Sequence, residues 1–166
     1  MPEKETIERA REDAREGKSP STQAGEFVRE EIHHIREGKH GASSTKQAIA
    51  IGLSKARRAG VQLKTPQKNT TSEATRKAAA RDSRKGRTGG KKKTSPRRSR
   101  AMLNRLKREG HSAASPQSLA RQARSAARRR SAASRSASAR KAARTKGPAK
   151  RRAAAKKGAR TRARRG

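Results

Sequence analysis

The stretch SSTKQAIAIGLSKARRAGV, residues 43–61, is the part of this chain that most clearly predicts a helix with a buried face. Its opening serine and threonine hydroxyls can accept hydrogen bonds from the first amides of a helix. Gly60 supplies the left-handed residue at which helices end, and Val61 follows to close against the last turn. Between these ends, small and branched apolar residues recur at helical spacing: Ala48, Ile49, Gly52, Leu53 and Ala56. We expect this helix to anchor the core.

Two more helices are expected before this segment. Residues 3–16 alternate charges of both signs around a thin apolar stripe and end at a glycine. Ser19 and Pro20 form a common helix start, and the helix that follows them stops at Gly38. Its apolar residues are Ala24, Phe27, Val28, Ile32 and Ile35. The sequence therefore predicts an all-α fold whose N-terminal unit, the head (residues 1–63), consists of two to three short helices.

Charge is unevenly distributed along the chain. The formal net charge is +35 over 166 residues. The head holds 12 Lys and Arg against 10 Asp and Glu, whereas the basic body (residues 64–166) holds 36 Lys and Arg against 3 Asp and Glu. A near-neutral head followed by a polycationic body predicts a polyanionic partner, with nucleic acid as the first candidate.

The basic body lacks the residues needed for a hydrophobic core. Its apolar side chains beyond alanine are Met102, Leu103, Leu106 and Leu119. Low hydrophobicity with many like charges is typical of disorder. We therefore expect residues 64–130 to be a basic linker with isolated short helices. Residues 131–166 contain only Ala, Ser, Arg, Lys, Gly, Thr and one Pro, and we expect them to form a disordered, low-complexity cationic tail.

Composition also argues against several classes of function. The chain has no cysteine, which excludes disulfides and thiolate metal sites. No apolar run approaches the ~18 residues that span a bilayer, and the N-terminus has no secretory signal pattern. We expect a cytoplasmic protein of the nucleoid with no membrane partner. Because no phosphate loop, zinc-protease motif or catalytic triad is recognisable, we expect no enzymatic activity, no catalytic residue and no cofactor.

Basic residues of the body are the candidate nucleic-acid contacts. Each Lys or Arg that neutralises a phosphate releases counterions, which gives affinity that is sequence-independent and steeply salt-dependent. The helix within residues 43–61 carries its cations at its end, whereas base-reading residues usually lie near the start of a recognition helix, so we expect no sequence-specific reading. The candidate contacts are Lys91, Lys92, Lys93, Arg97, Arg98, Arg105, Lys107, Arg108, Arg121, Arg124, Arg128, Arg129 and Arg130.

The four residues Ser95-Pro96-Arg97-Arg98 have two interpretations. They resemble the S/T-P-K/R-K/R motif of histone tails, in which a compact turn places two cations along the minor groove. The same Ser-Pro pair is also an ordinary helix start. The sequence alone leaves both interpretations open.

Carboxylates and histidines lie close together in the sequence of the head: Glu30, Glu31, His33, His34, Glu37 and His40. The spacing Glu30-x-x-His33 occurs in di-iron helical bundles, but such sites need two copies of this motif and two further carboxylates. The head has no clear second set. We interpret these residues as solvated helix surface and expect no metal site.

Two blocks of the head carry a resemblance to a known family. REGKSPSTQAGEFVREEIHHIREGKHG (15–41) and SSTKQAIAIGLSKARRAGV (43–61) resemble small bacterial proteins that have an N-terminal domain of unknown function and a basic tail. The resemblance implies a bacterial source and an α-helical head, and it assigns no activity. The tail resembles bacterial histone-H1-like proteins in composition, although residues 64–166 hold 23 Arg and 13 Lys where those tails are rich in Lys.

Together these observations favour a non-enzymatic, sequence-tolerant protein that binds double-stranded DNA in the nucleoid. We expect the basic body to neutralise and bridge duplexes, and the head to act as a homodimerisation or interaction module. Two alternatives stay open. One is an RNA- or ribosome-associated basic protein. The other is an adaptor whose head recruits a partner while the tail tethers it to nucleic acid.

Overall fold

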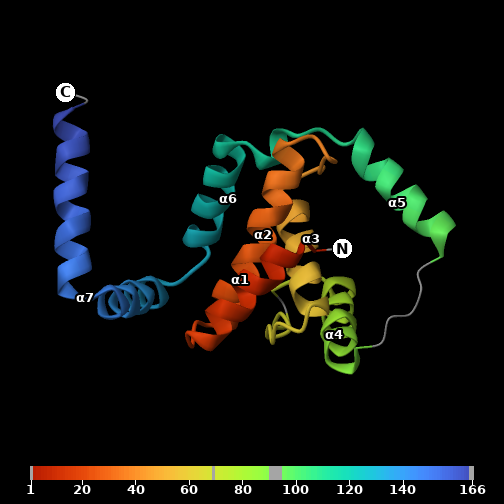
Figure 1. The fold of residues 1–166 in the computed structure, drawn as a ribbon, viewed down its shortest axis with the longest axis horizontal. Helices are drawn as coiled ribbons and strands as arrows, with labels where there is room; N and C mark the ends of the chain where they lie inside the picture. Colours follow the sequence, from red (N-terminus) through yellow and green to blue (C-terminus); the bar gives the residue numbers. More distant parts are fainter. Residues whose placement is uncertain (1, 69, 90–94, 165–166) are drawn as a thin grey trace. The chain divides into compact units, whose positions relative to one another are not determined.

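The computed structural model describes residues 2–68, 70–89 and 95–164, and within these ranges all regular secondary structure is helical (Figure 1). This confirms the prediction of an all-α fold. No helix in the described ranges is long and apolar enough to cross a membrane. In chain order the elements are α1 (Lys4–Arg15), α2 (Pro20–Arg36), α3 (Thr45–Arg58), α4 (Glu73–Thr88), α5 (Pro96–Arg108), the 3-10 helix η1 (Ser112–Ala114), α6 (Pro116–Arg128) and α7 (Ala132–Ala163).

The core lies among α1, α2 and α3, with α2 packed against both of the others (Figure 1). Phe27 of α2, the only Phe, Tyr or Trp of the chain, is 1% exposed. Two clusters of buried apolar side chains hold these helices together. One consists of Ile32, Ile35, Ala42, Ala48, Ala113 and Ala114, and the other of Ala10, Ala24, Phe27 and Ala56.

Helix α3 begins and ends as the sequence predicts. The Ser44 side chain accepts a hydrogen bond from the Gln47 amide at 3.2 Å and caps the N-terminus. At the other end Gly60 has a φ of +98°, and the amide of Val61 donates to the carbonyl oxygen of Ala56 at 3.1 Å. The predicted stripe faces α2 and the core. Its buried members are Ala48, Gly52 and Ala56, and its half-buried members are Ile49 and Leu53.

The motif Arg-Glu-Gly ends three helices in two different ways. Helices α1 and α2 stop at Gly17 and Gly38, whose φ angles of +69° and +76° are those of a left-handed helix stop. The third copy ends α5, but there Glu109 has an extended backbone. The Gly110 carbonyl oxygen then accepts a hydrogen bond from the amide of Ala42 at 3.1 Å. The third copy thereby ties the chain after α5 to the loop between α2 and α3.

Buried contacts continue beyond residue 63, because α4 packs against α3. Asp82 of α4 is 4% exposed. It accepts hydrogen bonds from the Ser54 hydroxyl at 2.6 Å and from Arg58 Nε at 3.0 Å. Burial opposes ionisation of this carboxyl, but the hydrogen bonds from Ser54 and Arg58 outweigh it, and the pKa of Asp82 lies below its usual value. Part of the predicted linker is thus fixed to the head by an ion pair between the buried Asp82 and the exposed Arg58.

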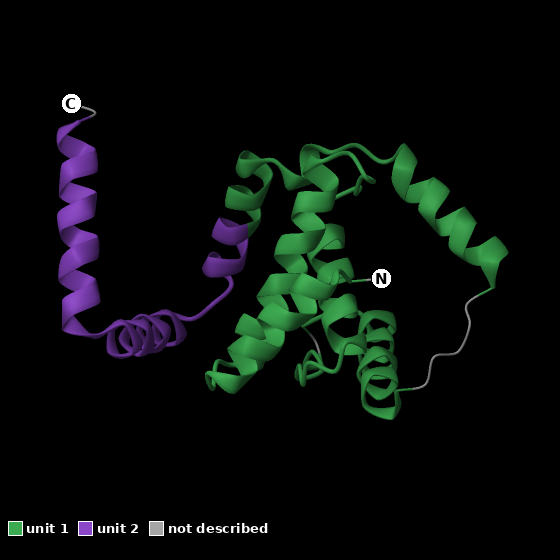
Figure 2. Ribbon diagram, in the orientation of Figure 1, with its two compact units in different colours: residues 1–122 green, residues 123–166 purple. Residues whose placement is uncertain are grey.

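The short η1 helix is also part of the core. The Thr45 hydroxyl donates to the carbonyl oxygen of Ala113 at 2.6 Å, and Arg36 Nε donates to that of Ala114 at 2.9 Å. The chain divides into two compact units, residues 1–122 and residues 123–166 (Figure 2). The domain boundaries predicted from the sequence lie after residues 63 and 130, because apolar content falls there. The contacts of α4 and η1 with the head are made by alanines and polar groups, which a fall in apolar content does not reveal.

The second unit consists of the end of α6 and helix α7, and neither helix has a buried residue. Helix α7 is interrupted at Gly147 (φ 67°, ψ 169°), immediately before Pro148, because proline disfavours a helical conformation in the residue before it. The disordered tail expected for residues 131–166 is therefore not confirmed. Ala, Arg and Lys have high intrinsic helix propensity, and the structure forms this helix although none of its residues is buried.

Candidate nucleic-acid interface and buried charge cluster

Five of the predicted contact residues lie on α5: Arg97, Arg98, Arg105, Lys107 and Arg108. All five are exposed, and no residue of α5 is buried. The helix presents these cations to solvent rather than to the core. Lys91, Lys92 and Lys93 lie outside the described residues.

The segment Ser95-Pro96-Arg97-Arg98 forms the start of α5, with Pro96 in the first turn. Of its two interpretations, the helix start is therefore the conformation in this structure. The first turn of α5 contains no acidic residue. The N-terminus of a helix carries a partial positive charge, which repels the two arginines beside it. A bound anion would offset this repulsion.

The remaining predicted contacts lie on or directly after α6. Arg121 belongs to the first unit, while Arg124 and residues 128–130 belong to the second; all are exposed. Residues 123–166 contain 18 Lys and Arg and no Asp or Glu. No side-chain carboxylate of this unit is available to neutralise its cations.

Six of the twelve Lys and Arg of the head, in contrast, have a carboxylate oxygen within 4.0 Å. Arg9 Nε lies 2.8 Å from Glu26 Oε2, and Lys18 Nζ lies 2.7 Å from Asp13 Oδ1. Hydrogen bonds to Asp13 and to Glu16 hold the pKa of Lys18 above its usual value. Carboxylates of the head therefore neutralise half of its cations, whereas the second unit has no carboxylate side chain to do so.

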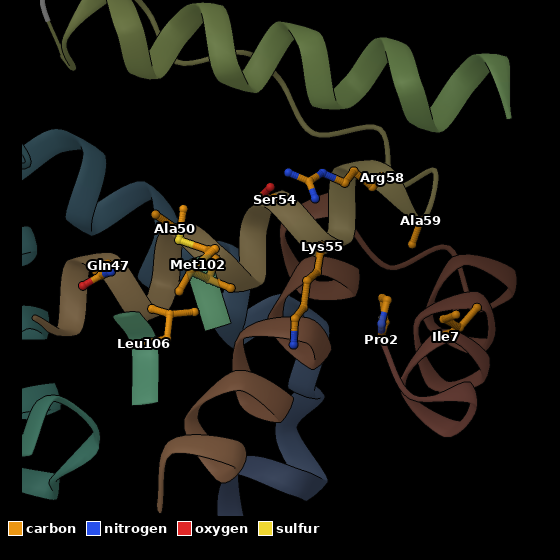
Figure 3. Close-up of a pocket in the computed structure, with 11 residues that line it drawn as sticks. Pro2, Ile7, Gln47, Ala50, Ser54, Lys55, Arg58, Ala59, Met102 and Leu106 are labelled. Carbon is orange, nitrogen blue, oxygen red and sulfur yellow. The ribbon is translucent and has the colours of Figure 1, made fainter. Parts of the chain in front are cut away.

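An apolar groove of about 690 Å³ lies on the outer side of α3 (Figure 3). Its lining includes Ile7 of α1, Ala50 and Ile51 of α3, and Met102 and Leu106 of α5. Met102 is 56% exposed. The groove has room for apolar side chains of another molecule, and the sequence did not reveal it.

Glu30 and Glu31 are buried, which corrects the interpretation of this segment as solvated surface. They are 4% and 0% exposed. Lys55 Nζ of α3 lies 3.2 Å from Glu30 Oε1 and 2.7 Å from Glu31 Oε2. Glu31 follows Phe27 and precedes Ile35 by four residues each, so it shares their core-facing side of α2. This four-residue spacing indicates that Glu31 faces the core, but its charge led the sequence analysis to assign it to the surface.

Two histidines complete this buried charge cluster. The side chains of His34 and His40 are 13% and 12% exposed. His34 Nε2 lies 2.8 Å from Glu3 Oε1, and hydrogen bonds from His34 and then from Lys39 lower the pKa of Glu3. His40 Nε2 lies 3.4 Å from Glu31 Oε1. We call Glu30, Glu31, His34, His40 and Lys55 the buried charge cluster; His33 and Glu37 remain exposed, as predicted.

Residues 6–69 match the model of a family of unknown function, DUF6496. The match covers the greater part of α1 and all of α2 and α3, and therefore includes the five residues of the buried charge cluster. It supports the resemblance of the head to a family of unknown function and assigns no activity. No curated protein and no solved structure matches the chain.

Proposed function

We propose that this protein is a non-enzymatic, sequence-tolerant DNA-binding protein of the nucleoid, similar to histone H1, that neutralises and bridges duplex DNA. The observation that carries this proposal is the second unit, whose 18 Lys and Arg have no acidic counterpart within it. No residue of α6 or α7 is buried. Binding is driven by the counterions released when these cations neutralise phosphates.

The spacing of the cations supports bridging. Basic residues occupy consecutive positions at 150–152 and again at 156–157. Because an α-helix has 3.6 residues per turn, neighbours in the sequence point to different sides of it. A helix with cations on several sides can contact phosphates of two duplexes at once. The interruption at Gly147 and Pro148 lets the two halves of α7 follow separate stretches of backbone.

Arg97 and Arg98 make a second contact in this proposal. They stand beside the positive N-terminal end of α5 and have no acid in that turn. A phosphate at this end would neutralise the two guanidinium groups and the helix dipole together. The alternative in which the pair enters a minor groove requires the first turn of α5 to unwind.

The salt dependence of duplex DNA binding tests the proposal. Filter binding with full-length protein is expected to give log K that falls linearly with log salt concentration. Replacing residues 128–130 by serine should reduce this slope by about 2.7, since each phosphate contact contributes about 0.9. The matched control replaces three exposed cations of α1, namely Lys4, Arg11 and Arg15, and should leave the slope unchanged. Equal effects of the two triple variants would contradict the proposal.

The same titration with a folded RNA separates the nucleoid interpretation from a ribosome-associated one. We expect comparable or tighter binding to duplex DNA at matched salt, and equal binding to AT-rich and GC-rich duplexes. A clear preference for RNA would favour the RNA-associated alternative.

For the head, the apolar groove favours association with another protein surface. We propose a second copy of this chain as the occupant, because nine of the eleven residues that line the groove belong to the head, whose net charge is only +2. Sedimentation of the full chain at increasing concentration is expected to yield a dimer that Ile51→Lys disrupts, whereas Ala14→Lys, at an exposed site outside the groove, does not. A monomer at all concentrations would favour the adaptor alternative.

A further inference from the structure

Three side chains of the buried charge cluster direct potential metal-binding atoms toward one another. Glu31, His34 and His40 each offer one such atom, and these atoms all lie within 4.8 Å of one another. Glu31 is fully buried, and neither of its oxygens has a hydrogen-bond partner among the described residues. A buried carboxylate oxygen without a partner is costly. The Lys55 ammonium lies beside Oε2, so Oε1, which is 3.4 Å from His40 Nε2, is the oxygen that a further cation would satisfy.

The ring of His40 is oriented by a hydrogen bond on its outer side. His40 Nδ1 lies 3.1 Å from the carbonyl oxygen of Gly41. A carbonyl oxygen can only accept, so Nδ1 carries a proton; when the ring is neutral, Nε2 therefore presents a lone pair. That lone pair lies 3.4 Å from Glu31 Oε1, which is also an acceptor. Two acceptors facing each other require a cation or a proton between them.

His34 is oriented in the same manner. Its Nε2 donates to Glu3 Oε1 at 2.8 Å, which leaves Nδ1 as the lone-pair nitrogen, 4.0 Å from Glu30 Oε1. Histidines that bind metals almost always donate their other ring N–H to a carboxylate or a backbone carbonyl oxygen. His34 has a carboxylate partner, Glu3, and His40 has a backbone carbonyl partner, Gly41.

The net charge of the cluster is negative, which favours binding of a divalent cation. Lys55 Nζ lies 2.7 Å from Glu31 Oε2, without the direction of a hydrogen bond, and leaves Oε1 free. Lys39 Nζ lies 3.4 Å from Glu3 Oε1 and 3.1 Å from Glu37 Oε2. With neutral imidazoles, the four carboxylates of Glu3, Glu30, Glu31 and Glu37 exceed these two ammonium groups by two negative charges. A dication would bring the net charge of the group from −2 to 0.

We propose that Glu31, His34 and His40 form a binding site for a first-row divalent cation, with Zn²⁺ as the preferred ion. Two imidazoles and a carboxylate suit zinc, which binds these ligands at about 2.0–2.2 Å. Donor atoms around one ion must therefore lie within roughly 4 Å of one another, twice that length. Small side-chain rotations close the remaining difference from 4.8 Å. Three protein ligands leave a fourth position for water or for a ligand from a partner.

Such an ion would connect α2 to the loop that follows it. Glu31 and His34 lie on α2, whereas His40 lies beyond the glycine at which α2 ends. The ion would fix this loop against the helix and stabilise the head. The site is independent of the basic residues proposed to bind DNA.

The test is a titration with Co²⁺, whose visible absorption reports the type and number of its ligands. The full-length chain is first freed of nucleic acid in high salt and of metal by a chelator. We expect one Co²⁺ per chain, displaced by Zn²⁺, and a melting temperature that rises with Zn²⁺ concentration. His40→Ala and Glu31→Gln should lower the affinity by about 100-fold or more, and Glu3→Gln, which acts through His34, by about 10–100-fold.

Two exposed histidines provide matched controls. His33 lies on the same helix as His34, and His111 lies near the same loop; replacing either by alanine should leave Co²⁺ binding unchanged. Absence of binding, or equal loss in the His33→Ala variant, would overturn the proposal. Nitrogen NMR of the unmodified, metal-free chain requires no variant to fold. Protonated His40 Nε2 at neutral pH, unchanged by Zn²⁺, would show that a proton fills the site and would equally overturn it.

Discussion

Replacing Gly52 by alanine tests the closest approach between α2 and α3. A Cβ at this position would lie 2.7 Å from Val28 Cα and 3.0 Å from the carbonyl oxygen of Phe27, whereas ordinary contacts are 3.4–4 Å. Both neighbours are backbone atoms, which cannot rotate away. The two helices must therefore separate by roughly 1 Å, which forfeits part of the dispersion energy across both core clusters.

Two opposing terms set the magnitude. Alanine is favoured over glycine in a helix interior by about 1 kcal/mol, while overpacking a core costs about 1–3 kcal/mol. Adding the loss of contacts along the whole α2–α3 interface, we expect Gly52→Ala to destabilise the fold by about 1–2 kcal/mol net. At about 4 °C per kcal/mol, this lowers the melting temperature by about 4–8 °C.

The matched control is Gly25→Ala. Gly25 lies within α2 and has no atom within 4 Å of a Cβ placed on it, so only the helix-propensity gain of about 0.5–1 kcal/mol remains. Thermal unfolding followed by far-UV circular dichroism gives the two melting temperatures. Methyl resonances beside Phe27, the only Phe, Tyr or Trp side chain, report the head alone by NMR. Equal stabilisation by both substitutions would refute the close helix contact.

Two further predictions concern the head. Leu53→Asp places a carboxylate against the cluster around Phe27 and should abolish the cooperative unfolding of the head, since burying an unpaired charge costs several kcal/mol. DNA binding measured by filter assay should persist in this variant. The matched variant Leu103→Asp, on the exposed face of α5, should leave the melting temperature unchanged. Asp82→Asn should lower the melting temperature at neutral pH. Because the folded pKa of Asp82 lies below its usual value, its ionised form stabilises the fold above about pH 4, and this contribution disappears as the pH falls through the folded pKa. The difference between wild type and Asp82→Asn should therefore shrink below about pH 4; a difference that does not vary with pH would count against the ion pair with Arg58.

Helix boundaries could be predicted from the sequence because they depend on residues within about four positions of each other. The Ser-Pro pairs at 19–20 and 95–96 start α2 and α5, and glycines with positive φ end α1, α2 and α3. Helix caps and glycine stops use the local backbone and need no partner elsewhere. The exposure of Arg97, Arg98 and the other predicted contact residues on α5 and α6 follows from composition in the same way, since these helices have few apolar side chains to cover them.

The buried charge cluster could not be predicted from the sequence, because it joins residues far apart in the chain. Lys55 meets Glu31 only when α3 packs across α2, and Glu3 meets His34 only when the start of α1 returns to α2. Hydropathy assigned these charged residues to the surface, and their burial depends on partners supplied by other helices. The same holds for Asp82, whose partners lie 24 and 28 residues away.

The sequence by itself determined the all-α class, the ends of the helix at residues 45–58 and the separation of a near-neutral head from a polycationic body. These follow from backbone capping and from the sum of charges, neither of which requires a tertiary contact. Only the tertiary structure decided that Ala113 and Ala114 enter the core, that α4 docks on α3 and that Glu31, His34 and His40 converge. Small or charged side chains carry no hydropathy signal of burial, and the partners that bury them come from other helices, which only the folded chain brings together.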